Sequence, residues 1–134
     1  MTDRIRALAL LLAAALLILG AGAHAVKGWT LVGEVLGAQP SSAGLMGVLS
    51  AGWQLGSVSL LAFGLLVLVA GLARWRGQPV ASAMLWIVAA ALVSFGIGAV
   101  LLGDRTFFYF YFGYVVIGGL LALGVAPRAE VGSG

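Results

Sequence analysis

The single histidine of this chain, His24, is the side chain that offers the most chemistry. Neutral imidazole can bind haem iron or another metal, and its charge changes near neutral pH. His24 stands among small residues between Gly20 and Trp29, where a long apolar run ends. A polar side chain in such a run indicates function. A histidine that is hydrogen-bonded to Gln54, to a tyrosine or to water is the structural alternative.

Gln54 is the amide placed inside another apolar run, at about the same expected depth as His24. The chain has no cysteine and no second histidine, and no acid lies in the interior of an apolar run. We therefore expect no metal site and no catalytic residue, because both need several ionisable groups brought together. Phosphate-binding loops and HExxH or nucleophile-elbow motifs are absent from the sequence.

Seven aromatic residues occupy the eight positions from Phe107 to Tyr114. Three of them, Tyr109, Tyr111 and Tyr114, carry hydroxyl groups. Such a run is typical of the belt that amphipathic rings form at a membrane interface. It covers every side of a helix, so some rings also face protein or a ligand. A flat lipophilic cofactor, such as a haem, a quinone, a carotenoid or another pigment, is the corresponding binding hypothesis for His24, Gln54 and these tyrosines.

The elements that hold these residues are predicted to be membrane-spanning helices. The chain has 134 residues, of which 63% are hydrophobic and 8% charged, whereas a soluble domain is about 25% charged. Apolar runs long enough to cross a hydrocarbon core of about 30 Å predict an all-α membrane protein in one domain. The expected spans are residues 5–25, 46–72, 80–102 and 107–125, with a disordered tail at 129–134.

Basic residues predict how the spans are oriented. Five bases flank the runs on one side, and Lys27 and Arg105 stand on the other. The positive-inside rule then places both termini in the cytoplasm, which an even number of spans also requires. We expect the bacterial inner membrane. The first run also has features of a cleavable signal, but it is longer than the usual apolar core of about 7–15 residues, so we expect an uncleaved helix.

The connections predict an up-down four-helix bundle. Short turns near residues 73–79 and 103–106 favour antiparallel neighbours, so the second, third and fourth helices are expected to pack in series. The connection 26–45 is longer, and Leu31, Val32, Val35 and Leu36 recur in it at helical spacing. This pattern predicts a short interfacial helix between the first two spans.

Small residues are the expected packing surfaces, since helices in lipid associate by close approach rather than by burial of apolar area. Gly52 and Gly56 form a GxxxG pair, and Ser94 and Gly98 a related pair. Gly20 and Gly28 flank His24 at four-residue spacing, which favours an inward-facing histidine.

The layout resembles that of small four-helix bacterial inner-membrane proteins without an assigned activity. The likeness rests on Gly20-x3-His24, Trp29, the glycine-rich second span with Gly52 and Gly56, and the short basic turns. It is similar in general plan to the DoxX-like membrane families. The resemblance implies the fold and no catalytic residue.

Three functions remain open from the sequence. We expect a non-enzymatic accessory or structural subunit, which packs against larger membrane proteins or against itself and binds no nucleic acid. Abundant small residues and scarce ionisable groups favour it. The alternative is a binder of a lipophilic cofactor through His24 and the aromatic run. A small channel or carrier is the weaker third possibility.

Overall fold

The protein is all-helical in the computed structural model, which describes residues 2–37, 43–102 and 108–126. The described elements, in chain order, are α1 (Asp3–Ala23), the π-helix η1 (His24–Gly28), α2 (Trp29–Gly37), α3 (Ala43–Trp75), α4 (Ser82–Leu102) and α5 (Phe108–Val125). Four helical stretches are long and apolar enough to cross a membrane: Asp3–Glu34, Gly44–Trp75, Ser82–Leu102 and Phe108–Val125. The expected tail at 129–134 lies outside the described residues.

The first predicted span and the short helix predicted after it form one continuous helical rod. The α1 helix passes through η1 into α2 without leaving helical geometry, so the helix predicted inside the long connection continues the first span directly. A stretch of 32 residues is about 48 Å long at about 1.5 Å per residue. This exceeds the hydrocarbon thickness of about 30 Å.

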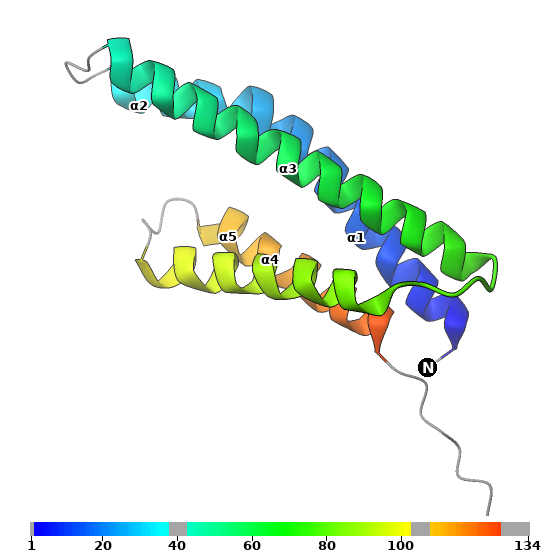
Figure 1. The fold of residues 1–134 in the computed structure, drawn as a ribbon. Helices are drawn as coiled ribbons and strands as arrows, with labels where there is room; N and C mark the ends of the chain where they lie inside the picture. The colour runs from blue at the N-terminus through cyan, green and yellow to red at the C-terminus, as the bar shows by residue number, and fades with distance from the viewer. Residues whose placement is uncertain (1, 38–42, 103–107, 127–134) are drawn as a thin grey trace, which may run out of the picture.

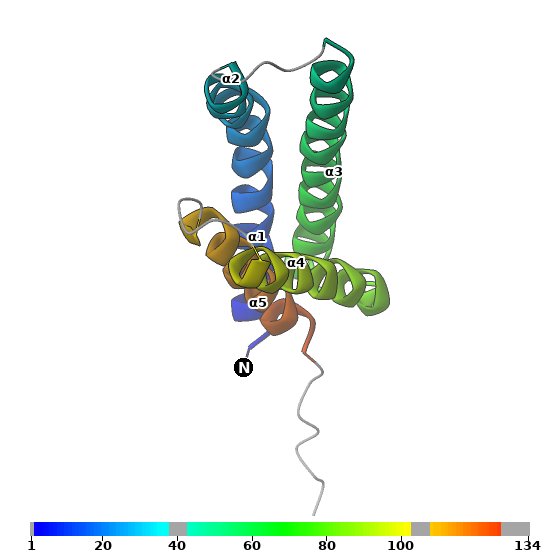
Figure 2. The ribbon, with the colours of Figure 1, turned by 90° about the vertical axis from the view of Figure 1, so that its left-hand side faces the viewer.

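Two packed helix pairs make up the fold. Helix α1 packs along α3, and α4 packs along α5, while α1 also contacts α5 and thereby joins the pairs (Figure 1). Figure 2 shows the α4–α5 pair crossing the lower part of the α1–α3 pair rather than following its whole length. The pairs converge near the N-terminus and separate toward α2.

Helices α3 and α4 differ from the predicted series of neighbours. They are joined by a short turn, in which Gly77 adopts a positive φ of 73°, yet they do not pack along each other in the described structure. The shared partner is α1, whose inward face carries buried side chains at helical spacing: Ala7, Leu10, Ala14, Leu17 and Ala21. Burial on α1 therefore determines the arrangement more than turn length does.

Glycines let the helices approach closely, but mostly at other positions than expected. A Cβ added to Gly64 would lie 2.7 Å from Ile18 Cγ1, and one added to Gly71 would lie 2.9 Å from Leu11 Cδ2. These two glycines of α3 are seven residues apart and receive side chains of α1. On the other pair, Gly96 and Gly118 bring α4 and α5 together, and Gly124 receives Leu10 of α1.

The predicted packing residues divide into two groups. Gly28 and Gly56 lie at contacts, against Trp53 and His24 respectively. A Cβ at Gly20, Gly52 or Gly98 would meet no described atom within 4 Å, and Ser94 is exposed. The GxxxG argument is therefore wrong for Gly52 inside this chain, because spacing alone does not determine which face of α3 meets α1.

Candidate functional site

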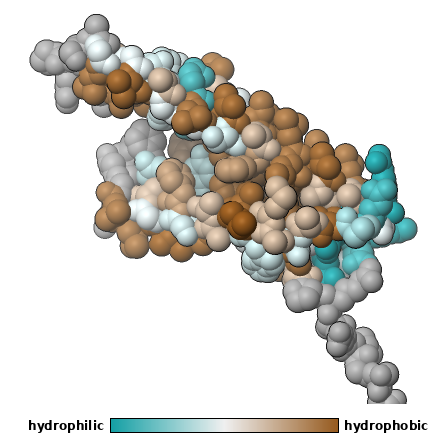
Figure 3. All heavy atoms as spheres, viewed as in Figure 1, coloured by the Kyte–Doolittle hydropathy of each residue, from teal (hydrophilic) through white to brown (hydrophobic). Residues whose placement is uncertain are grey.

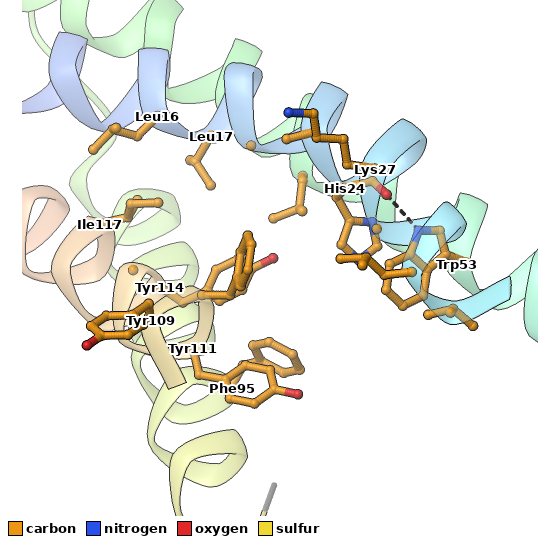
Figure 4. Close-up of a pocket in the computed structure, with 18 residues that line it drawn as sticks. Leu16, Leu17, His24, Lys27, Trp53, Phe95, Tyr109, Tyr111, Tyr114 and Ile117 are labelled. Atoms are coloured by element: carbon orange, nitrogen blue, oxygen red, sulfur yellow. Dashed lines mark hydrogen bonds between the residues drawn. The ribbon is translucent and has the colours of Figure 1, made fainter. Parts of the chain in front are cut away.

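A cavity lies where the two helix pairs separate. Its volume is about 580 Å³, and its lining is mostly apolar. The surface is hollowed between the pairs in the space-filling view (Figure 3). His24, Gly28 and Trp53 stand on the wall formed by α1, η1 and α3, whereas Phe95, Tyr111 and Tyr114 stand on the wall formed by α4 and α5 (Figure 4). The structure thus brings His24 and the aromatic run to one space.

The π-helix shapes the His24 wall. It begins at His24, and the Trp53 indole N–H donates a hydrogen bond of 2.7 Å to the His24 carbonyl oxygen (Figure 4). A π-helical turn changes the usual backbone ladder and often marks a functional site. Gly28 makes this contact possible, since a Cβ there would lie 2.5 Å from Trp53 Cζ2. Trp53 is therefore held to η1 by both shape and hydrogen bonding.

The imidazole of His24 is held on two sides. Its ring stacks on Trp53 with centroids 4.1 Å apart and an interplanar angle of 5°. Its Nδ1 lies 2.8 Å from the hydroxyl oxygen of Ser57, a buried residue one turn after Trp53. Stacking and hydrogen bonding together fix the orientation of the ring, as partners of a ligating histidine do.

The hydrogen bonds of Ser57 also indicate which ring nitrogen of His24 carries the proton. The Ser57 hydroxyl donates to the carbonyl oxygen of Trp53 at 3.1 Å, and a hydroxyl has one hydrogen to donate. When the hydroxyl donates there, its oxygen accepts from Nδ1–H, and from this arrangement we infer that the neutral imidazole carries its proton on Nδ1. The lone pair stays on Nε2, which no hydrogen bond within the described part of the chain occupies. His24 can therefore offer a ligand an acceptor or a metal-binding nitrogen.

The opposite wall is built around Phe95. Its ring makes edge contacts with Tyr114, at a centroid distance of 5.1 Å, and with Tyr111, at 6.4 Å. Figure 4 shows these two tyrosines reaching toward the side of the cavity where His24 lies. Tyr109 borders the cavity, but it is 85% exposed and points away. Two phenolic hydroxyls, each able to donate and accept, thus face the His24 wall.

Gln54 does not belong to this site. It is exposed and does not line the cavity. Of the hydrogen-bond partners that the sequence left open for His24, Gln54 is therefore wrong, and the partner is Ser57. Trp53 and Ser57 are four residues apart and share the face of α3 that meets α1, whereas neighbouring positions on a helix point about 100° apart. Ser57 was missed because a serine in a span is common. Its spacing from Trp53 was the available signal.

Metal binding by clustered side chains finds no support in the described ranges, which hold no group of three histidine, cysteine or acidic residues close enough to share an ion. His24 alone would have to be an axial ligand to a metal that another group already holds.

Comparison with known proteins gives no match: no family model, no curated protein and no solved structure resembles the chain significantly. The likeness to DoxX-like families therefore stays an expectation.

Proposed function

We propose that this protein binds a lipophilic ring compound that carries hydroxyl groups, of the hydroquinone class, in the cavity between its two helix pairs. The supporting observation is the placement of His24 opposite Tyr111 and Tyr114 in one apolar cavity, and the proposal takes the lone pair of the imidazole to stand on Nε2. A volume of about 580 Å³ is within the range of about 300–1,000 Å³ typical of small-molecule sites. We propose no catalytic role.

Polar groups on both walls favour this ligand class over the other candidates. A carotenoid chain without oxygen would give the Nε2 acceptor of His24 no hydrogen-bond partner, which is costly in an apolar site. A ring with oxygens at opposite ends can form a hydrogen bond on each wall of the cavity, because one hydroxyl donates to His24 and the other reaches a tyrosine.

The assigned tautomer predicts that the reduced ligand binds more tightly than the oxidised one. A hydroquinone hydroxyl donates to Nε2, whereas a quinone carbonyl only accepts and would face another acceptor. The expected difference in affinity is about tenfold, because that ratio corresponds to roughly the free energy of one hydrogen bond. Titration of the protein in nanodiscs with a short-tailed benzoquinol and its benzoquinone, followed by tryptophan fluorescence quenching, measures it. Absence of binding by either form would refute the proposed function.

The same proposal places the chain in a membrane as an up-down bundle. The ends that carry Asp3, Arg74, Ser82 and Val125 line one common cavity, which supports alternating helix directions. The arginines at that end favour its placement, with both termini, on the cytoplasmic side of a bacterial inner membrane. His24 follows α1, whose 21 residues span about 32 Å. The cavity would then lie near the outer edge of the hydrocarbon, with α2 in the outer interface.

A topology measurement checks this placement. A reporter enzyme that is active only in the cytoplasm, fused after Ala126, should be active, and a periplasm-specific reporter fused there should not. The physical reason is the accumulation of arginines at the end where α3 and α4 are joined. Activity of the periplasmic reporter at the C-terminus would contradict the cytoplasmic placement of the termini.

A second proposal retains the accessory-subunit role. Gly44, Gly47 and Gly52 form part of α3 where an added Cβ would meet no described atom within 4 Å. Helices in lipid use such surfaces to associate, so this stretch of α3 is available to a larger membrane partner or a second copy. Co-purification in mild detergent would identify the partner.

A further inference from the structure

A second cavity, of about 670 Å³, lies at the opposite end of the molecule from α2. Four helix ends and the turn between α3 and α4 form it, and the hydrophilic residues at this end stand out in Figure 3. Its polar lining residues are Asp3, Arg6, Arg74, Gln78 and Ser82. Two arginines and one carboxylate give this lining a net positive charge.

Arg6 is the unusual residue of this cavity, since it is 4% exposed although it is charged. It pairs with Asp3 one turn earlier, at 3.6 Å between Nη1 and Oδ1. Buried charge is costly unless it serves function or is well compensated, and the Asp3 side chain is itself 42% exposed. The ion pair with Asp3 holds the Arg6 guanidinium at the cavity. Without it, the long side chain of Arg6 would extend into solvent.

The turn leaves recognition to side chains. The backbone N–H groups of Arg76, Gly77 and Gln78 all donate to carbonyl oxygens at the end of α3, so they are not available to a ligand. Arg74 near the end of α3, Gln78 in the turn and Ser82 at the start of α4 supply the donors beside Arg6. Donors of this kind, with arginine foremost, are suited to phosphate oxygens.

Apolar residues line the remaining part of the cavity. Val80, Trp86 and Val125 belong to it, and Trp86 is 45% exposed. Tryptophan favours the depth where lipid headgroups meet acyl chains. A ligand of matching shape therefore has an anionic head beside the arginines and a hydrocarbon portion that continues along α4.

We propose that this cavity binds an anionic phospholipid, with its phosphate between Arg6 and Arg74 and its acyl chains along Trp86. This site is independent of the cavity beside His24, because the two cavities share no lining residue. Basic pockets between spanning helices on the cytoplasmic side recognise lipid headgroups by the same electrostatics.

Native mass spectrometry of the protein from nanodiscs that contain phosphatidylglycerol in phosphatidylcholine tests the site. The parent should retain phosphatidylglycerol selectively, and Arg74→Gln should weaken this retention about tenfold, the loss of a charge-assisted hydrogen bond. Arg76→Gln is the matched control, since Arg76 is exposed on the same turn and does not line the cavity. Arg76→Gln should leave retention at the parent level.

Three outcomes would overturn the proposal. Equal weakening by Arg74→Gln and Arg76→Gln would mean that general surface charge attracts the lipid. Displacement of the lipid by inorganic phosphate at equal concentration would mean that the cavity takes a free anion. Equal retention of both lipids by the parent would mean that the site has no headgroup preference. Circular dichroism melting of each variant shows that the comparison is made between folded proteins.

Discussion

Replacing Gly118 by leucine should sharply destabilise the protein, whereas the same change at the next residue, Gly119, should not. A Cβ at Gly118 would overlap Val93 Cγ2 and lie 3.0 Å from the backbone oxygen of Ala89. Backbone of α4 cannot yield without opening the α4–α5 pair. At Gly119 an added Cβ meets no described atom within 4 Å. Leucine there would face lipid.

The expected loss for Gly118→Leu is at least about 1–3 kcal/mol, the usual cost of overpacking a close contact. Gly119→Leu should stay within about 0.5 kcal/mol, as surface substitutions do. Thermal unfolding in one detergent, followed by circular dichroism, compares the two variants directly. Similar melting of both would show that α4 and α5 do not approach each other through Gly118.

Spans and helix type could be predicted from the sequence because backbone in lipid has few alternatives. Long apolar runs must form helices there, so four spanning candidates follow from composition and length. Helix rotation could not be predicted in the same way. Gly52 and Gly56 have the spacing of a packing motif, yet α1 meets α3 through Gly64 and Gly71. Which face is buried depends on how leucines of a partner helix fit, and one sequence does not reveal that.

The candidate site was predictable only in part, because its residues could be recognised but the rotation of the helices that carry them could not. His24 and the tyrosines were recognisable as unusual residues at the same expected depth, and they line one cavity. The hydrogen-bond partner was not recognisable, because Gln54 and Ser57 are both polar and lie less than one turn apart on α3. Only the rotation of α3 determines that Ser57 faces His24 while Gln54 is exposed. The π-helix had no sequence signal beyond the glycine at position 28 that faces Trp53.

His24→Phe should remove most of the affinity for a hydroquinone while preserving the wall that holds it. Phenylalanine keeps a ring that can stack on Trp53, but it has no acceptor for the ligand hydroxyl. A hydroxyl buried without a partner costs about 1–3 kcal/mol, which corresponds to about tenfold or more in affinity.

Ser57→Ala probes the tautomer separately. It leaves the imidazole present but removes the oxygen that holds the proton on Nδ1. The ring can then present either a donor or an acceptor at Nε2. Affinity for the quinone should rise toward that for the hydroquinone.

The central claim is tested most directly by the dissociation constants of the reduced and oxidised ligand, measured in nanodiscs for four proteins: the parent, His24→Phe, Ser57→Ala and Gln54→Ala. Gln54→Ala is the matched control, because Gln54 is polar and neighbours Trp53 but lies outside the cavity. The site described here predicts tight hydroquinone binding by the parent and by Gln54→Ala, a loss of about tenfold or more in His24→Phe, and a reduced-to-oxidised preference that disappears in Ser57→Ala. Unchanged hydroquinone affinity in His24→Phe would contradict it.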